Sequence, residues 1–223
     1  GGSLFQPDMI ARIVRVGLPA ALEQFVSRVG QVFFLRIVSG LGTLAYAAHT
    51  VAVNAESISF MPAFGFATAA TTLVGQSLGA GDPEMAERSG WATWKITASI
   101  GAGAALLMLL IPELMMRIYT TDAEVIRIGQ DYLVIVSSFY VFFTAMFAYT
   151  GMLRGAGATL VPMVITLLSL WVVRVPLSVY MAANFGVNGI WWALPVSWLM
   201  GLVATWGYYQ SGRWKNKGVI NHT

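Results

Sequence analysis

The run LVPMVITLLSLWVVRVPLSVYMA, which extends from Leu160 to Ala182, decides the class of this protein. Arg174 is its only charged side chain. A helix needs about 20 predominantly apolar residues to cross the hydrocarbon core of a bilayer. Because the run reaches that length, it predicts a transmembrane helix.

Five other apolar runs of bilayer length surround this one, and short turn-rich or charged segments separate them. The six predicted spans cover residues 10–38, 46–78, 91–111, 132–152, 160–182 and 187–209. Of the 223 residues, 57% are hydrophobic and 10% are charged, whereas soluble domains carry about 25% charged residues. These values exclude a soluble globular domain. The sequence predicts an all-α membrane protein built as a six-transmembrane-helix bundle.

The bundle is expected to occupy residues 10–211. Residues 1–9 are expected to be an N-terminal segment or the remnant of a tag, because the chain opens with Gly-Gly-Ser. Residues 212–223 are expected to form a basic tail. Since the opening residues do not look like a natural start, we expect a fragment of a longer protein.

Positive charges are divided unequally between the two ends of the predicted spans. An even number of spans places both termini on one side, together with the second-to-third and fourth-to-fifth connectors. That side carries Arg12, Arg15, Arg88, Lys95, Arg154, Arg213, Lys215 and Lys217, and the opposite side carries Arg36, Arg117, Arg127 and Arg174. Cytoplasmic loops are enriched in Lys and Arg, so the termini are predicted to be cytoplasmic. Arg36 and Arg154, near span ends, are expected to reach toward lipid headgroups.

The sequence offers no support for a metal site, a cofactor, nucleic-acid binding or enzymatic activity. It contains no cysteine, and its two histidines, His49 and His222, are too few for a zinc centre. The cations flank apolar spans and do not form a basic patch interleaved with surface aromatic residues. The HExxH and P-loop patterns are absent, and the one GxSxG match, GQSLG at residues 75–79, falls at the end of a predicted membrane span and not on a strand-to-helix turn. We therefore expect a membrane protein that is not an enzyme and holds no cofactor.

Two acidic residues, Glu23 and Glu56, fall well inside predicted spans. A charge at the centre of a membrane helix costs about 2.5–3.5 kcal/mol on insertion scales, so such residues are functional candidates by default. A carboxylate that is dry in one state and wetted in another can exchange a proton or another cation. The alternative is structural, with both acids bonding neighbouring helices through Arg28, His49 or backbone groups.

Polar residues accompany both acids. Ser27 and Gln31 follow Glu23 at helical spacing, and Asn54 lies on a face of the second span next to that of Glu56. Together these groups predict a hydrated polar interior. The candidates for binding substrate or cation are Glu23, Glu56, Asn54, Gln24, Ser27 and Gln31, with Arg28 and His49 as supporting residues.

Two connectors carry signals for the start of a helix. Asp82 can cap a helix that begins at Pro83, which suits the first helical position. Thr121 or Asp122 can cap a short amphipathic stretch, which is expected to lie at the membrane interface. Trp191 is expected in the outer aromatic belt, at the level of the headgroups.

Five ordered segments have a specific pattern: GLPAALEQ (17–24), LGTLAYAAH (41–49), GQSLGAGDPEMAER (75–88), YTTDAEVIRIGQDYL (119–133) and GMLRGAGATLVPM (151–163). They are spread along the chain from residue 17 to residue 163. In this order they resemble the carboxyl-terminal half of the multidrug and toxic compound extrusion (MATE) transporters, which are cation-coupled efflux carriers.

The resemblance implies one six-helix lobe of a twelve-helix transporter, whose two lobes enclose a cleft that opens to alternate sides. The implied function is secondary active efflux of amphipathic or cationic organic compounds in exchange for H⁺ or Na⁺ across the bacterial inner membrane. Besides the lipid bilayer and these small substrates, the implied partner is a second lobe, either a missing amino-terminal half or a second copy of this chain. In one bacterial branch of the family, a cation-binding Glu lies about one turn beyond Glu23, near Ser27, and an Asp corresponds to Phe143, so neither acid carries over.

Two other functions stay open. A lipid-linked oligosaccharide flippase of the same superfamily would need a cationic cavity for a phosphate group, for which Arg28 and Arg174 are the candidates. A channel-like or structural six-helix subunit would need no coupled transport. A groove that contains both arginines would favour the flippase, and single-channel currents would favour the channel.

Overall fold

A computed structural model describes residues 7–216, which are helical with short connectors and contain no β-strand. The predicted all-α class is confirmed. The elements are α1 (Pro7–Gly40), α2 (Thr43–Gly79), α3 (Pro83–Leu110), α4 (Pro112–Arg117), α5 (Ala123–Ser137), α6 (Tyr140–Gly155), α7 (Leu160–Leu167), the π-helical η1 (Leu168–Arg174), α8 (Val175–Gln210) and the 3₁₀-helical η2 (Arg213–Asn216).

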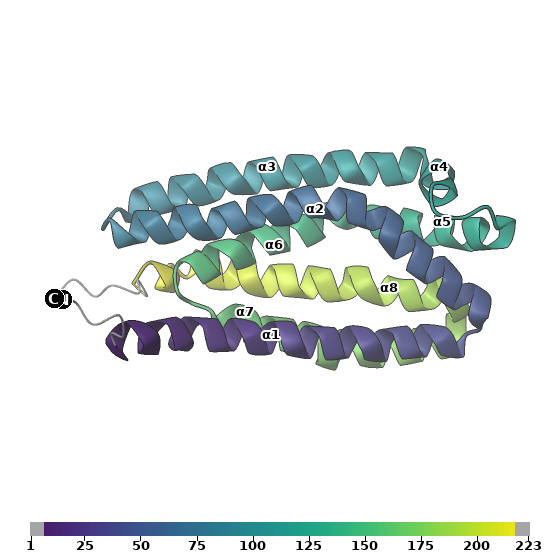
Figure 1. Ribbon diagram of the computed structural model, residues 1–223, viewed down its shortest axis with the longest axis horizontal. Helices are drawn as coiled ribbons and strands as arrows, with labels where there is room; N and C mark the ends of the chain where they lie inside the picture. Colours follow the sequence, from purple (N-terminus) through teal and green to yellow (C-terminus); the bar gives the residue numbers. More distant parts are fainter. Residues whose placement is uncertain (1–6, 217–223) are drawn as a thin grey trace.

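The long helices lie side by side as an elongated bundle (Figure 1). α2 packs against α3 and α6 on one side, whereas α1 packs against α7 and α8 on the other. Both ends of the described chain lie at the same end of the bundle as the α2–α3 and α6–α7 connectors (Figure 1). This arrangement is the one that an even number of membrane crossings requires.

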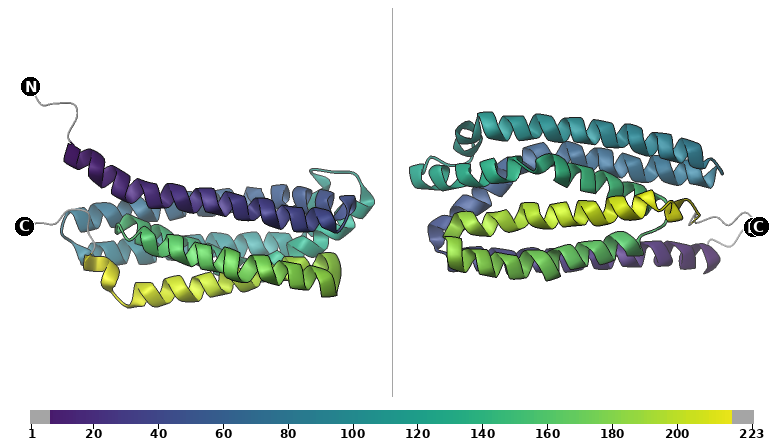
Figure 2. Two further views of the ribbon diagram at one scale, coloured as in Figure 1. Left: turned by 90° about the horizontal axis from the view of Figure 1, so that it is seen from below. Right: turned by 180° about the vertical axis from the view of Figure 1, so that it is seen from behind.

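The chain reverses its direction inside α8 at Gly186. This residue has φ 64° and ψ −145°, a backbone conformation that other residues adopt only with strain. Residues 160–185 and 187–210 therefore form two antiparallel legs (Figure 2). The sequence predicted a connector between residues 182 and 187. In the structure the only non-helical residue of this connector is Gly186.

Replacing Gly186 by alanine is expected to lower the free energy of unfolding by about 1–3 kcal/mol, because the native φ is strained for any residue with a Cβ atom. A Cβ atom added at Gly186 would meet nothing within 4 Å, so crowding does not contribute. Gly103→Ala is the matched control, since Gly103 has the same open space within a regular helix. Thermal unfolding in detergent compares the two variants, and equal stability would contradict the strain.

Three continuous helical segments of the described chain are long and apolar enough to cross a membrane: α2, α3 and Leu160–Gln210. The helices α5 and α6, bent by 56° at their break, would together form a further span. The segment Leu160–Gln210 supplies two legs because it folds back at Gly186. α1 occupies the first predicted span but is not among these segments, since charged and amide side chains interrupt its apolar residues. The count of six spans therefore stays a prediction.

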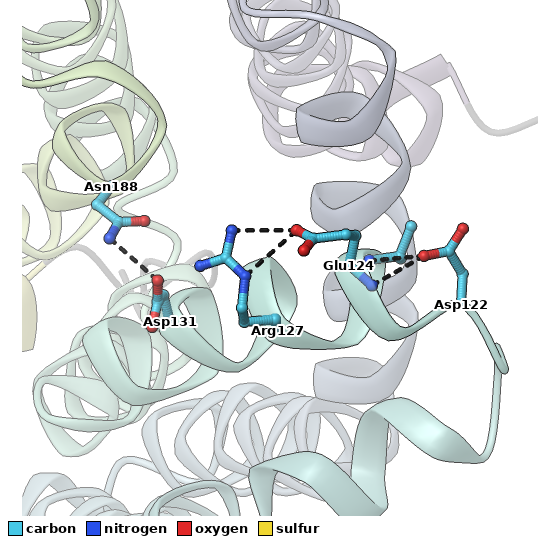
Figure 3. Close-up of polar contacts among 6 residues, drawn as sticks. Asp122, Glu124, Arg127, Asp131 and Asn188 are labelled. Carbon is cyan, nitrogen blue, oxygen red and sulfur yellow. Dashed lines mark hydrogen bonds and ion pairs between the residues drawn. The ribbon is translucent and has the colours of Figure 1, made fainter.

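Both predicted helix starts are confirmed. Asp82 caps α3, accepting a hydrogen bond from the backbone N–H of Met85 at 2.8 Å. Asp122 caps α5, accepting bonds from the backbone N–H groups of the second and third helical residues at 2.9 and 3.1 Å (Figure 3). The amphipathic stretch after Asp122 is helical and continues as α5 without a break to Ser137, while its position at the membrane interface stays a prediction.

Polar contacts on α5 connect it to the last leg of the chain. Arg127 pairs with Glu124 of the same helix at 3.1 Å, whereas the Asp131 carboxylate accepts a bond from the Asn188 side-chain amide at 3.1 Å (Figure 3). Asn188 follows the reversal at Gly186 by two residues. The start of the last leg is therefore fixed to the helix that carries the core residues Tyr132 and Val136.

Two tryptophans are more buried than the sequence suggested. Trp191, expected at the level of the headgroups, is 0% exposed and packs in the core, so neighbouring helices cover it. Trp214, in the predicted basic tail, is 1% exposed, and its indole N–H donates to the carbonyl of Tyr209. The Lys215 ammonium pairs with Glu87 of α3 at 2.6 Å. The tail thus packs on the bundle as far as residue 216, while residues 1–6 and 217–223, including Lys217 and His222, lie outside the described residues.

α2 and α6 approach each other closely because α6 presents glycines to α2. A Cβ atom at Gly151 or Gly155 would collide with the backbone carbonyl of Ala67 or Thr71, respectively. The Thr71 hydroxyl donates a hydrogen bond to the Gly151 carbonyl at 2.9 Å, which ties a side chain of α2 to the backbone of α6. Small residues at helix contacts allow this approach in membrane proteins.

Candidate functional site

The first predicted acid, Glu23, is the centre of a contact between three helices. Its Oε1 atom accepts a hydrogen bond from Nη2 of Arg154 at 2.8 Å and another from Oγ1 of Thr166 at 3.0 Å. Glu23 lies near the middle of α1, Arg154 in the last turn of α6 and Thr166 in α7. The contact joins α1 to the helices on both sides of the α6–α7 connector.

The Glu23–Arg154 ion pair leaves one atom of each partner unbonded. Oε2 of Glu23 and Nε of Arg154 are buried and have no hydrogen-bond partner among the described residues. Arginine can hold a carboxylate through two parallel bonds, but here Nη2 alone reaches it. Arg154 neutralises Glu23 from within the lobe, so Glu23 is not an uncompensated negative charge.

The partners of Glu23 differ from those that the sequence suggested. Arg154 turns inward to Glu23, so its expected extension toward the headgroups was wrong. Arg28 is exposed, and its guanidinium donates to the Gln31 side chain at 3.4 Å. The structural alternative for Glu23 is therefore realised through a residue from another helix.

The second predicted acid, Glu56, is buried in the core beside an aromatic residue of α5. The Tyr132 hydroxyl donates a hydrogen bond to Oε2 of Glu56 at 2.6 Å. Tyr132 packs edge-on against Trp191, with ring centroids 5.4 Å apart, and against His49 at 5.3 Å. Nδ1 of His49 is buried without a partner among the described residues, so His49 supports the Tyr132 ring and does not bond Glu56.

Arg174 is a cation whose charge acts on this second acid. Its charge acts on both Glu56 and Tyr132, although it forms no ion pair within 4 Å. Nε of Arg174 donates to the Ser197 hydroxyl at 2.8 Å, which holds the guanidinium on the last leg of the bundle. The environment of Glu56 therefore contains one hydrogen-bond donor in contact and one positive charge at longer range.

The remaining candidates lie on the outside of the lobe. Gln24 and Gln31 on α1 and Asn54 on α2 are exposed, and Ser27 is partly exposed. Thr68, Thr72 and Gln76 are also exposed on α2, but a stretch of exposed apolar residues separates them from Asn54. The polar residues predicted to accompany Glu23 on α1 are thus separated from it. Glu23 lies inside the lobe, whereas the amide side chains of Gln24 and Gln31 lie on its outside.

Two shallow depressions lie at the other end of the bundle from the Arg154 connector. One, of about 410 Å³, is lined by residues that include Glu113, Arg117 and Gln130. The other, of about 300 Å³, is lined by residues that include Arg127 and Asp131. Neither depression touches Glu23 or Glu56. Within residues 7–216, acidic and histidine side chains form no cluster of three that would hold a metal ion.

A protein-family model named MatE matches residues 19–180. The chain belongs to the MatE family. This match covers both acids, the Arg154 connector and the α5–α6 break. The resemblance drawn from the five sequence segments is confirmed.

MatE relatives with curated names include proteins of several bacteria. The chain is 35% identical, over 93% of its length, to the "probable multidrug resistance protein NorM" of Thermotoga maritima, of which it covers 45%. It is 27% identical to the "probable multidrug resistance protein YpnP" of Bacillus subtilis, over 92% of this chain and 46% of that protein. The chain therefore spans about half the length of the curated relatives that it matches.

Solved MatE structures share the fold of this chain. The Vibrio cholerae MATE transporter VcmN in its bent form superimposes with a TM-score of 0.85 at 19% identity, over 93% of this chain and 48% of that one. A MATE protein in the straight conformation gives a TM-score of 0.86 at 19% identity, over 95% and 48%. These likenesses support an all-α membrane bundle that corresponds to half of a transporter.

The position of Phe143 shows how this MatE chain departs from the acidic pattern that the resemblance implied. The Phe143 ring lies 4.5 Å from that of Trp198, 4.9 Å from Phe147 and 5.7 Å from Phe60. An aromatic cluster between α2, α6 and α8 thus occupies the place where an Asp was implied. Within the described residues, Glu56 is one helical turn from this cluster through Phe60.

Three residues of the two acid clusters were not among the predicted site residues. Tyr132, Arg154 and Thr166 hold the acids but lie 76, 131 and 143 residues from them in the chain. A tyrosine in an aromatic-rich chain and an arginine at a span end are both ordinary in membrane proteins. Nothing in their local sequence distinguishes them, so only the three-dimensional structure identifies them.

Proposed function

We propose that the chain is one lobe of a secondary active exporter that moves amphipathic or cationic organic compounds out of the cell in exchange for H⁺ or Na⁺. The family assignment supports this, and so do the multidrug resistance names of its relatives. Because the chain spans about half of those relatives, the complete transporter needs a second lobe. The exposed polar residues of α1 and α2 would line the cleft between the two lobes.

The observation that carries this proposal is a carboxylate buried inside a span without an ion-pair partner in the described chain. Glu56 is 9% exposed and is held by a neutral donor, Tyr132, whereas Arg154 neutralises Glu23. We therefore place the exchange at Glu56 and give Glu23 a supporting role. A dry carboxylate prefers its neutral form and a wetted one its charged form, so opening the cleft to alternate sides changes its affinity for a cation.

The proposed orientation places the end of the bundle with the α2–α3 and α6–α7 connectors in the cytoplasm. Arg88, Arg154, Arg213 and Lys215 belong to that end, and the opposite connectors carry Arg117 and Arg127. This asymmetry follows the enrichment of cations in cytoplasmic loops. The proposed location is the inner membrane of a bacterium.

Vesicles that contain the complete protein test the proposed function. A gradient of H⁺ or Na⁺ is expected to drive uptake of a cationic fluorescent dye, and Glu56→Gln is expected to reduce the rate at least 10-fold, because the amide cannot exchange a cation. Glu113→Gln is the matched control, since Glu113 is exposed and pairs with Arg117 at the bundle end. Transport by Glu56→Gln at the rate of the control would reject the assignment of Glu56, and absence of transport by the unmodified protein would reject the function.

The positions of two arginines support this exporter over a flippase. Arg28 lies on the exposed face of α1, whereas Arg174 is bonded to Ser197 inside the lobe. The two arginines therefore do not face a common groove in the described residues, as a phosphate-binding flippase would need. A channel would be recognised by single-channel currents from the purified chain.

A further inference from the structure

Two tyrosines near Glu56 lie on either side of the break between α5 and α6. The helix α5 ends at Ser137 and α6 begins at Tyr140, and their axes differ by 56°. Tyr132 lies on α5 before the break and bonds Glu56, whereas Tyr140 is the first residue of α6 after it. One phenol thus belongs to each side of the bend.

The Tyr140 hydroxyl is an unused donor in the core. The side chain is 0% exposed, and its hydroxyl has no hydrogen-bond partner among the described residues. It lies within range of the charge of Glu56. Burying a polar group without a partner is unfavourable, so it calls for an explanation. A second conformation, in which the Tyr140 hydroxyl forms a hydrogen bond, would explain why this group is buried.

The groups that face Glu56 suit a proton better than a metal cation. They are Tyr132 from α5, Tyr140 from α6 and Arg174 from η1, while His49 lies on the same helix two turns away. Hard metal cations are held by about six oxygen ligands. Two phenols and one carboxylate supply fewer, and the Arg174 charge opposes a second cation. A proton needs only the carboxylate itself.

We propose that Glu56 is a proton-binding site with two alternative phenol donors, and that Tyr140 joins Tyr132 on the carboxylate when the proton leaves. This deepens the proposed function, on which its role in transport rests. An ionised carboxylate accepts up to about four hydrogen bonds. The contact with one phenol corresponds to the protonated carboxyl group. A second bond from Tyr140 would draw the start of α6 toward α2 and change the bend between α5 and α6.

Infrared difference spectroscopy of the purified full chain in lipid nanodiscs tests the proton site without transport. A carbonyl band of a buried protonated carboxyl group should disappear as the pH rises, and it should be absent in Glu56→Gln. Tyr140→Phe removes one donor to the ionised form, so the pH at which half of the band is lost should rise by roughly one to two units. Replacing Na⁺ by K⁺ should leave that pH unchanged.

Tyr149→Phe is the matched control for this measurement. Tyr149 is another buried tyrosine of α6, but its ring lies against Trp94 and Tyr209 and not near Glu56. Its removal should leave the half-loss pH of the band unchanged. An equal effect of Tyr140→Phe and Tyr149→Phe would overturn the role of Tyr140, and a dependence on Na⁺ would overturn the proton assignment.

A distance measurement tests the coupling between the proton and the bend. The chain contains no cysteine, so Glu124→Cys and Val141→Cys can carry spin labels on α5 and α6 without removing native thiols. Pulsed electron resonance should show a distance between the labels that shifts with pH, and Tyr140→Phe should abolish the shift. A distance that is independent of pH would refute the coupling. A site that titrates in a protein that transports nothing would uphold the proton site and reject the proposed function.

Discussion

Arg154→Leu is expected to lower the free energy of unfolding by about 3 kcal/mol, because it leaves the Glu23 carboxylate buried without its counter-charge. Glu23 is 5% exposed and takes both of its hydrogen bonds on one oxygen, so the leucine variant would retain the Thr166 bond alone. The expected value is at the lower end for a broken buried pair because the Arg154 side chain is 26% exposed. Thermal or denaturant unfolding of the chain in detergent measures the loss.

The double variant Glu23→Leu/Arg154→Leu separates the charge from the lost packing. Replacing both members of a buried pair by apolar residues is often neutral or stabilising, so the double variant should be more stable than Arg154→Leu. Arg117→Leu provides the surface control, since its pair with Glu113 is exposed on both sides and should be worth less than about 1 kcal/mol. A double variant as unstable as Arg154→Leu would show that the arginine stem, and not its charge, matters.

Gly155→Val is expected to destabilise the chain by about 3 kcal/mol and to separate α6 from α2. The added Cβ atom would collide with the carbonyl oxygen of Thr71, which is backbone and cannot move as a flexible side chain does. Overpacking of a close contact costs about 1–3 kcal/mol, and the rigid neighbour places this substitution at the upper end. Gly155 follows Arg154 directly, so the variant should also disturb the ion pair with Glu23.

Gly103→Val is the control for Gly155→Val, because a Cβ atom at Gly103 would meet nothing within 4 Å. The unfolding temperatures of both variants in detergent give the comparison. Crosslinking between cysteines introduced in α2 and α6 reports their separation independently. Equal unfolding temperatures of the two variants would contradict this prediction, because they would show that α2 and α6 can separate with no loss of stability.

Local sequence signals predicted the helices and their starts because those features depend on residues close together in the chain. The caps at Asp82 and Asp122 each involve residues within three positions. The sequence predicted a connector between residues 182 and 187, but it did not predict that the single residue Gly186 would make the turn. The length of the helix after Asp122 was not predicted, since nothing in the local sequence marks Ser137 as the end of α5.

The acid clusters could be predicted only in part. Burial of Glu23 and Glu56 follows from their place inside apolar runs, and both are buried. Their partners come from other helices, and a periodic pattern carries no information on which helix will face which. Arg154 shows this most clearly, because a cation at a span end has headgroups available, and only the packing of α1 against α7 offers it a nearer carboxylate.

The one-residue reversal at Gly186 limits how the lobe can deform. A single residue joins the two helices of the final antiparallel pair, and Asn188 is bonded to Asp131. This pair of helices therefore has no hinge of its own at that end. Any rocking of the lobe must therefore be absorbed elsewhere, in the kink between α5 and α6 or in the swing of α1, while the hairpin travels as a single rigid body.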